Sequence, residues 1–128
     1  MVLVDTSVWI HFLRGREPYG AHLYALLHAH GVAGHSHVRG ELLIGDSGER
    51  SELLAQYRTL PWAGSVPDNE VESLIRHRRL HGRGIGWIDA HLLASCLVYG
   101  HRLWSADAPL IQLAQELNVN YAAAMLGR

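Results

Sequence analysis

Four acidic residues stand at positions from which their carboxylates could bind one metal ion together. Asp5 and Asp107 each follow directly on a short apolar run that predicts a strand. Glu41 lies in the early turns of one predicted helix, and Asp89 opens another that is almost continuously apolar. The carboxyl ends of parallel strands share one edge of a sheet, and ligand sites form at that edge. We therefore expect Asp5 and Asp107 to lie near each other there.

The chemistry that such a group supports is that of a hard divalent cation. Like charges at close range raise each other's pKa, and an ionised carboxylate among apolar residues is costly unless it is paired. A cation removes both penalties, and all-oxygen ligands favour Mg²⁺ or Mn²⁺ over zinc. Such a site can activate water and stabilise charge during phosphodiester hydrolysis. Each acid also has a plainer interpretation, because acids at helix starts often serve as caps or dipole partners.

The composition excludes several other kinds of chemistry. All 11 basic residues are arginine, so a phosphate-binding P-loop and a pyridoxal enzyme, which both need lysine, are excluded. The net charge is −1, but setting the four acids aside as metal ligands leaves more basic than acidic residues. The single cysteine, Cys96, predicts a buried thiol in a reducing compartment. The pairs His28–His30 and His35–His37 lack the i, i+4 spacing of a helical zinc pair, and no pair of cysteines accompanies them, so we do not expect zinc binding.

Alternating apolar runs and helical periodicities predict one α/β domain over residues 1–128, with a mainly parallel sheet covered by helices on both faces. Thr6 or Ser7 is expected to cap the first helix, and Ser36 a later one. No apolar stretch reaches the ~18 residues that span a membrane, and the N-terminus does not resemble a signal peptide, so we expect a cytoplasmic protein. The expected strands are 1–4, 32–34, 101–105 and 119–122, and the expected helices are 8–15, 18–30, 36–44, 49–60, 68–81, 87–99 and 109–117.

The segments around the four acids resemble the four sequence blocks of PIN domains, and look most like those of the bacterial VapC toxins. These segments are 4–10, 39–45, 86–94 and 103–107, and the match runs in order from residue 2 to about residue 121. The resemblance implies a Rossmann-like α/β/α fold with a mainly parallel four- or five-stranded sheet. It also implies an Mg²⁺- or Mn²⁺-dependent endoribonuclease, usually homodimeric, that pairs with an antitoxin of the VapB type.

The resemblance also assigns roles to individual residues. Small hydroxyl residues near the first and last acids, here Thr6 or Ser7 and Ser105, are expected to orient the ligands. A dense basic run is a candidate grip for RNA phosphates, although a solvated helix face is the alternative. The residues that take the metal-binding and catalytic positions are Asp5, Glu41, Asp89 and Asp107, and the basic run contributes Arg76, Arg78, Arg79 and Arg83.

Aromatic and histidine residues near these segments have structural interpretations that we favour. Trp9, Trp87 and Trp104 are expected to anchor the core rather than to stack on bases. His37 and His91 lie near expected site acids and could touch a substrate or tune a pH response. We favour surface or packing roles for both.

Two other functions stay open. A haloacid-dehalogenase-like phosphatase needs Asp-x-Asp after its first strand and a lysine, whereas here Asp5 is followed by Thr6 and Ser7 and no lysine is present. A non-catalytic RNA-binding or regulatory module on a degenerate PIN fold is the second alternative. The presence of all four acids speaks against degeneration.

Overall fold

Three short strands form a parallel sheet at the centre of the protein in a computed structural model that describes residues 1–121. The strands are β1 (Val2–Val4), β2 (Val32–Ala33) and β3 (Arg102–Trp104), in the order β2-β1-β3. All three residues of β1 are buried, because this central strand is covered on both faces. Val4 pairs with Trp104, so β1 and β3 end side by side.

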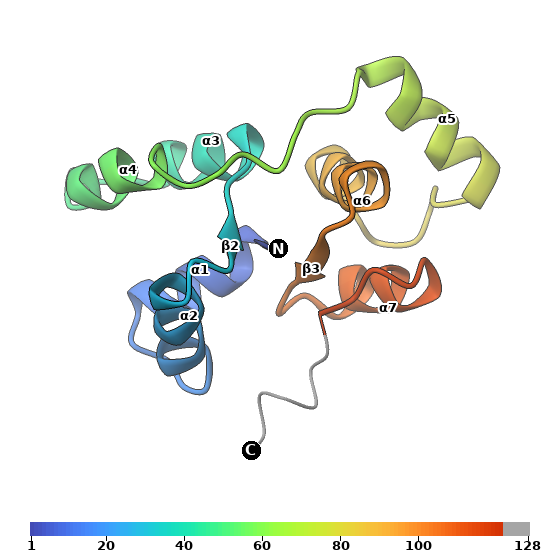
Figure 1. Ribbon diagram of the computed structural model, residues 1–128. Helices are drawn as coiled ribbons and strands as arrows, with labels where there is room; N and C mark the ends of the chain where they lie inside the picture. Colours follow the sequence, from blue (N-terminus) through green and yellow to red (C-terminus); the bar gives the residue numbers. More distant parts are fainter. Residues whose placement is uncertain (122–128) are drawn as a thin grey trace.

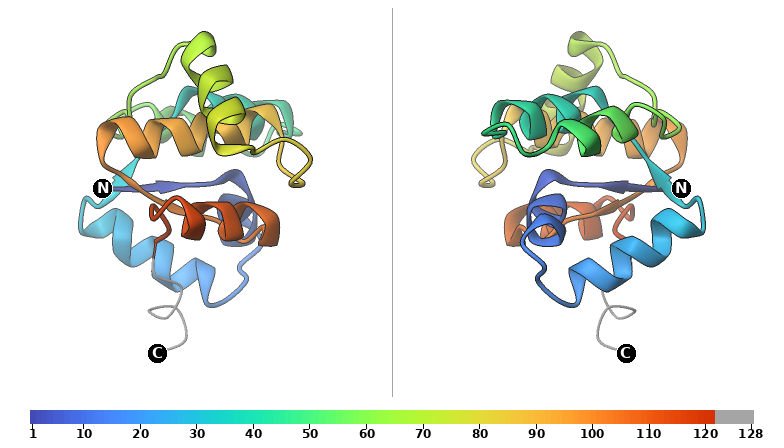
Figure 2. Two further views of the ribbon diagram at one scale, coloured as in Figure 1. Left: turned by 90° about the vertical axis from the view of Figure 1, so that its right-hand side faces the viewer. Right: turned by 90° about the vertical axis from the view of Figure 1, so that its left-hand side faces the viewer.

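Seven helices cover the sheet within the described residues (Figure 1). Helices α3, α4, α5 and α6 lie over one face, with α5 outermost, and α1, α2 and α7 lie over the other (Figure 2). The expected three-layer α/β/α arrangement is confirmed. None of these helices is long and apolar enough to cross a membrane. Their bounds are α1 (Thr6–Leu13), α2 (Tyr19–His28), α3 (Ser36–Ile44), α4 (Ser51–Tyr57), α5 (Asp68–Arg78), α6 (Trp87–Tyr99) and α7 (Ala108–Glu116).

The expectation of four or five strands is wrong for residues 1–121, where the sheet has three. The segment expected as a last edge strand forms a single bridge, between Asn120 and Leu103. Asn118, with φ 58°, turns the chain out of α7 just before this point, so little extended backbone precedes the bridge. The last residue of the expected strand, Ala122, lies outside the described residues.

The opposite edge of the sheet is extended in the same limited way. Gly34 and Trp62 form one isolated bridge beyond β2. Pro61 precedes Trp62 and has no N–H to donate, so the bridge does not continue into a ladder. The sheet is therefore narrower than the sequence pattern predicts, with one bridge at each edge in place of further strands.

Helix α6 is the most deeply packed helix of the described chain. Every residue from Ala90 to Cys96 is buried. Burial raises the pKa of the Cys96 thiol to about 12, which agrees with the expected structural role. Because α6 leads directly into β3, its N-terminus and Asp89 lie at the edge where the parallel strands end.

Candidate active site

Asp5 occupies the carboxyl end of the central strand. Its side chain is buried, with 5% of the residue exposed. Its backbone N–H donates to the carbonyl of Trp104 at 2.9 Å, which continues the pairing of β1 with β3 past their last residues. This register brings Ser105 next to Asp5, and Asp107 follows two residues later. The prediction that Asp5 and Asp107 follow strands at this edge is confirmed.

Two serine hydroxyls hold the Asp5 carboxylate in one orientation. Oδ2 of Asp5 accepts hydrogen bonds from Ser7 Oγ at 2.7 Å and from Ser105 Oγ at 2.8 Å. Backbone N–H groups fix the hydroxyls in turn, because Ala106 donates to Ser7 Oγ and Asp107 donates to Ser105 Oγ, both at 3.0 Å. Oδ1 of Asp5 accepts no hydrogen bond from residues 1–121, so it is the oxygen left for a ligand.

Thr6 ties a second acid to the same edge. Its Oγ1 donates to Glu41 Oε1 at 2.6 Å, which links the start of α1 to α3. The prediction that Thr6 or Ser7 caps α1 is wrong, since the N-cap is Asp5 and no side chain caps this end. Hydrogen bonds to a carboxylate are stronger than bonds to a neutral amide, so both hydroxyls are used by acids instead.

Asp89 and Asp107 each take the plainer role of an acid at a helix start. Asp89 Oδ2 accepts from the N–H of Gly86 at 3.2 Å. Asp107 is the N-cap of α7, and its Oδ2 accepts from the N–H of Leu110 at 3.3 Å. Each hydrogen bond uses Oδ2 of its carboxylate, and Oδ1 of each residue accepts no hydrogen bond from the described residues. Capping and ligand binding are therefore compatible in both residues.

The electrostatics of Asp89 show that the four acids act on one another. Burial raises the pKa of Asp89 from 3.8 to about 6. The negative charges of Asp5, Asp107 and Glu41 contribute to this rise in pKa, while the hydrogen bond from Gly86 opposes it. The folded, metal-free protein therefore disfavours the charged form of Asp89.

The donors that gather here suit a hard cation. Among residues 1–121, no three acidic, histidine or cysteine side chains are arranged closely enough to hold a metal ion. The groups nevertheless fit Mg²⁺ or Mn²⁺, because the donors are carboxylate and hydroxyl oxygens and one buried carboxylate is already oriented. The pKa of Asp89 is raised by burial first and by repulsion from the neighbouring acids second, and a cation would favour its charged form against both. The ligand roles of the four acids stay a prediction.

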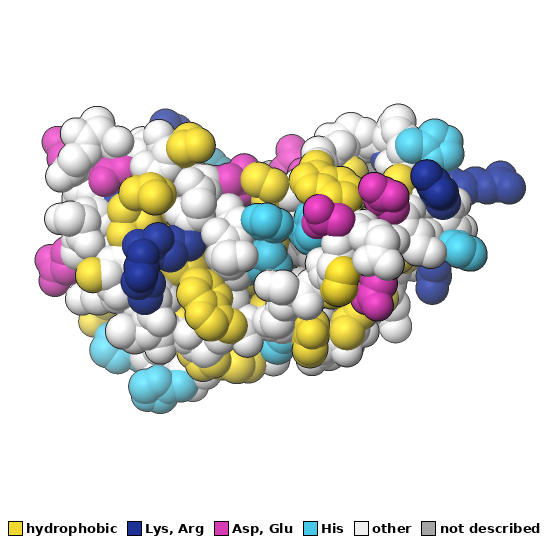
Figure 3. Space-filling view, turned by 90° about the horizontal axis from the view of Figure 1, so that it is seen from above, with side chains coloured by type: hydrophobic (Ala, Val, Ile, Leu, Met, Phe, Trp, Pro, Cys, Tyr) yellow, Lys and Arg dark blue, Asp and Glu magenta, His cyan; other side chains and the backbone are white. Residues whose placement is uncertain are grey.

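The basic run lies apart from these acids. Arg76 and Arg78 occupy the last turn of α5, and Arg79 is its C-cap with φ 54°. Figure 3 shows basic side chains projecting at the end of the molecule formed by α5, whereas acidic side chains gather at a hollow between its two ends. Arg83 forms an ion pair with Glu116 of α7. The contacts of these arginines with RNA stay a prediction. The ion pair with Glu116 would compete with RNA for the guanidinium of Arg83.

One of the tryptophan predictions is wrong. Trp9 and Trp104 are core residues, with 2% and 1% exposed, as expected. Trp87 exposes 43% of its surface. It is the first residue of α6, after a glycine-broken loop, and a residue at such a helix end extends past the packed layer. Its ring stands edge-on to His91, with centroids 4.7 Å apart, two residues before Asp89.

A histidine takes the capping place expected for Ser36. His35 is the N-cap of α3, and its Nδ1 accepts from the N–H of His37 at 3.1 Å. The proton of this ring therefore lies on Nε2, which donates to Ser95 Oγ at 3.1 Å. The hydroxyl of Ser36 cannot cap because the residue already lies inside the helix.

The histidines near the acids pack against one another. The rings of His37 and His91 meet edge to face with centroids 4.6 Å apart, and Nε2 of the buried His91 lies 3.1 Å from an oxygen of Asp68. The packing role favoured for His91 is confirmed by its exposure of 3%. Burial, followed by the charges of His37 and His91, lowers the pKa of His35 from 6.5 to about 4.

Comparison with known proteins agrees with this arrangement. Residues 2–119 match the PIN domain. Over 123 residues the chain is 41% identical to the protein named Ribonuclease VapC32 in two strains of Mycobacterium tuberculosis, CDC 1551 / Oshkosh and ATCC 25618 / H37Rv. The alignment covers 95% of this chain and 97% of each relative. With its strand-end acids in the expected order, the chain belongs to the PIN-domain family, as a VapC-type ribonuclease toxin.

Proposed function

We propose that this chain, as a single PIN-like domain, hydrolyses RNA phosphodiester bonds with Mg²⁺ or Mn²⁺ held by Asp5, Glu41, Asp89 and Asp107. One observation carries the proposal. Two serine hydroxyls orient the buried Asp5 carboxylate, and burial, followed by the charges of Asp5, Asp107 and Glu41, raises the pKa of Asp89. A protein without a cation has no use for such a group, because the repulsion destabilises the fold.

In this proposal, hydroxyl side chains orient the carboxylates, and the carboxylates supply the negative charge that attracts the cation. When bound, the cation supplies positive charge that offsets the carboxylates and stabilises charge developing on the phosphate. Ser7 and Ser105 occupy Oδ2 of Asp5, which leaves Oδ1 able to bind a cation, and Thr6 orients Glu41. Because the pKa of Asp89 is raised, a bound cation would favour its ionised form, and cation affinity should fall as the pH is lowered.

The proposed setting follows from the family. We place the protein in the cytoplasm, with RNA as its substrate and a VapB-type antitoxin as the partner that covers the acidic edge. A homodimer is the proposed assembly. Its support is the group of exposed apolar side chains, which includes Leu43 at 51%, Ile44 at 90% and Val98 at 60%.

Cleavage of total cellular RNA by the purified protein tests the function. We expect cutting with Mg²⁺ or Mn²⁺ and none in EDTA. Asp5→Asn should lower the rate more than about 100-fold, beyond the 10- to 100-fold loss typical when an orienting group is removed. Ser105→Ala removes one of the two hydroxyl donors to Asp5 and should fall within that smaller range.

Three outcomes would contradict this function. Cutting that survives EDTA or Asp5→Asn would show that the four acids are not the metal site. Binding of RNA without cutting, with either metal, would favour the non-catalytic RNA-binding module. Hydrolysis of small phosphate esters in place of RNA would favour another acidic-site phosphohydrolase.

Arg76 and Arg78 provide the test of the proposed phosphate grip. Both are exposed, so replacing them with glutamine removes charge and little packing. We expect the double variant to raise KM several-fold at unchanged kcat, and to lower the salt dependence of RNA binding by roughly 0.7 in a log–log plot for each phosphate that is no longer neutralised. Arg14→Gln, at the exposed C-cap of α1, is the matched control. An unchanged salt slope would identify the run as a solvated helix face.

A further inference from the structure

Trp62 is a half-exposed aromatic side chain held in a fixed position at the edge of the sheet. It exposes 51% of its surface. Its backbone is pinned on both sides, because Gly34 donates to the carbonyl of Pro61 at 2.8 Å and Ala63 donates to that of Gly34 at 2.7 Å. Its ring lies over Gly34, where a Cβ atom would come within 3.0 Å of Cζ3, and 5.9 Å from the ring of Tyr57. One side of the ring is packed and the rest is open.

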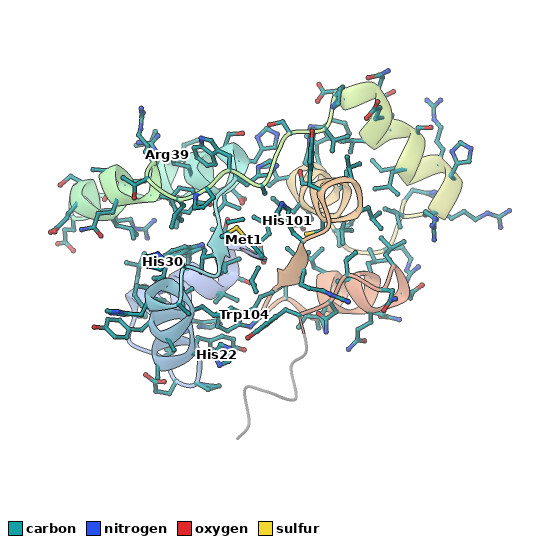
Figure 4. All side chains as sticks on the ribbon, in the orientation of Figure 1. Met1, His22, His30, Arg39, His101 and Trp104 are labelled. Atoms are coloured by element: carbon teal, nitrogen blue, oxygen red, sulfur yellow. The ribbon has the colours of Figure 1, made fainter. Side chains whose placement is uncertain are left out.

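A cationic cavity lies next to this ring. Its volume is about 440 Å³, and its lining residues are Ser36, Arg39, Gly40, Arg58 and Trp62. Figure 4 shows Arg39 in the layer of α3 and α4, at a distance from His101 and Trp104. The Nε of Arg39 donates to the carbonyl of Leu54 at 3.4 Å, which uses one of its five N–H groups. Neither Arg39 nor Arg58 forms an ion pair with a carboxylate of the described chain.

A second, uncharged cavity adjoins the first. Its volume is about 250 Å³, and its lining residues are Gly34, His35, Ser36, Trp62, Gly64 and Ser65. Trp62 and Ser36 therefore line both cavities. His35 is neutral at physiological pH because burial lowers its pKa to about 4. This cavity suits an uncharged ring with polar edges, whereas the first suits an anion.

We propose that Trp62, Arg39 and Arg58 form a second RNA-binding subsite, which holds single-stranded RNA away from the carboxylates. The two guanidinium groups bind a backbone phosphate, and a base stacks on the open part of the Trp62 ring. This subsite rests on the proposed ribonuclease function, because RNA is the ligand in both. Helix α3 carries Arg39 and Glu41 two residues apart, and so connects the subsite to the acidic edge.

The charges favour RNA over a second copy of the chain at this face. A symmetric dimer contact presents the same patch from both copies. Two pairs of guanidinium groups without acidic partners would then face each other across the contact. A phosphate backbone neutralises the same charges, and every base has a π-face that suits an exposed tryptophan.

Binding of a fluorescent single-stranded oligoadenylate to the full chain in EDTA tests the subsite. We expect Trp62→Ala to weaken binding about tenfold, within the range for loss of one stacked base, and Trp62→Phe to restore most of it. Arg39→Gln with Arg58→Gln should lower the salt slope by roughly 0.7 for each phosphate that the variant no longer neutralises. With metal, these variants should raise KM for RNA at unchanged kcat.

Two control variants test whether the effect is specific to the residues of this subsite. Tyr24→Ala removes another exposed aromatic residue, and Arg14→Gln another exposed arginine, and neither should change binding. Arg58→Gln alone should also weaken RNA binding. Arg58 is exposed and plays no part in the core, so this variant should fold normally. Unchanged RNA binding in the Trp62 and arginine variants would overturn the subsite while leaving metal-dependent cleavage intact.

The remaining outcomes separate the subsite from the function. If the wild type cuts no RNA with either metal while these variants weaken binding, the subsite stands and the ribonuclease proposal fails. If sedimentation shows that Trp62→Ala or Arg58→Gln separates a dimer while RNA affinity is unchanged, a second copy covers this face and the subsite is overturned.

Discussion

Asp89→Asn is expected to abolish RNA cleavage and, at the same time, to make the metal-free protein more stable at neutral pH. Burial and the neighbouring acids raise the pKa of Asp89 from 3.8 to about 6, so the folded state disfavours its charge above that pH. Because the side chain is partly exposed and solvent screens it, this shift corresponds to on the order of 1–2 kcal/mol of lost unfolding free energy at neutral pH. Asparagine removes the charge and keeps an oxygen that can accept from Gly86. We expect a gain of that order, and more than about a 100-fold loss of cleavage.

Two measurements on the same variant check this result. Urea unfolding in EDTA gives the stability of the metal-free protein, and cleavage of RNA with Mg²⁺ or Mn²⁺ gives the activity. Glu72→Gln, which neutralises an exposed acid of α5, is the matched control and should change neither. A destabilised Asp89→Asn would contradict the electrostatic account, whereas an active one would contradict the role of Asp89 as a ligand. Addition of cation should stabilise the wild type more than the variant.

Acidification from about pH 6.5 to pH 4 is expected to change the stability of the metal-free protein in two opposite ways. The pKa of His35 is lowered from 6.5 to about 4 in the folded state, so the unfolded chain takes up this proton first. The unfolding free energy therefore decreases as the pH is lowered. The pKa of Asp89 is raised from 3.8 to about 6, so the folded state takes up that proton first and stability rises as pH falls through 6. The effect of the buried His35 is on the order of 3 kcal/mol and that of the partly exposed Asp89 is smaller, so the two partly offset each other in the wild type.

Single variants separate the two contributions. Asp89→Asn keeps His35, so its unfolding free energy should fall steeply as pH is lowered. His35→Asn keeps an oxygen that can cap α3 but does not titrate, so its unfolding free energy should rise over the same range relative to its value at pH 6.5. Urea unfolding in EDTA at several pH values measures both slopes. Parallel pH profiles in the two variants would refute the assignment.

The positions of the strand-end acids could be predicted because they depend on local pattern and a general rule. A short apolar run that stops at an acid marks the end of a buried strand, and parallel strands end at one edge. Asp5 and Asp107 follow from this alone. Asp89 was marked by its almost continuously apolar surroundings, in which an unpaired carboxylate is costly. The resemblance of the surrounding segments supported Glu41, whose position in a helix carries no such signal. The buried Cys96 followed from its apolar neighbours.

Features that depend on contacts between distant segments could not be predicted. Local pattern predicts that the hydroxyls of Thr6 and Ser7 cap α1, but Glu41 and Asp5 compete for them. Only the resemblance to the family pointed to a role for such hydroxyls in orienting the acids. His35 became the cap of α3 in the same way, because burial keeps its ring neutral and able to accept.

The exposure of Trp62 and Trp87 could not be predicted from the sequence for a related reason. Trp87 belongs to an apolar segment, and only its place at the tip of α6 exposes it. Trp62 follows a helix-ending proline in a segment without periodicity, so nothing local marks it as a fixed surface residue. Its position depends on one bridge to Gly34, which only the folded sheet provides.

The pairing of β1 with β3 has a consequence for the cell that makes this protein. Asp5 leaves the ribosome early, but the Ser105 hydroxyl that orients it is 100 residues away in the chain. At translation rates of about 5–20 residues per second, that interval lasts roughly 5–20 s. Throughout it, the nascent chain lacks β3, Asp107 and one of the two hydroxyls that hold Asp5. We therefore expect the nascent chain, and any product of interrupted translation that lacks β3, to be inactive toward RNA.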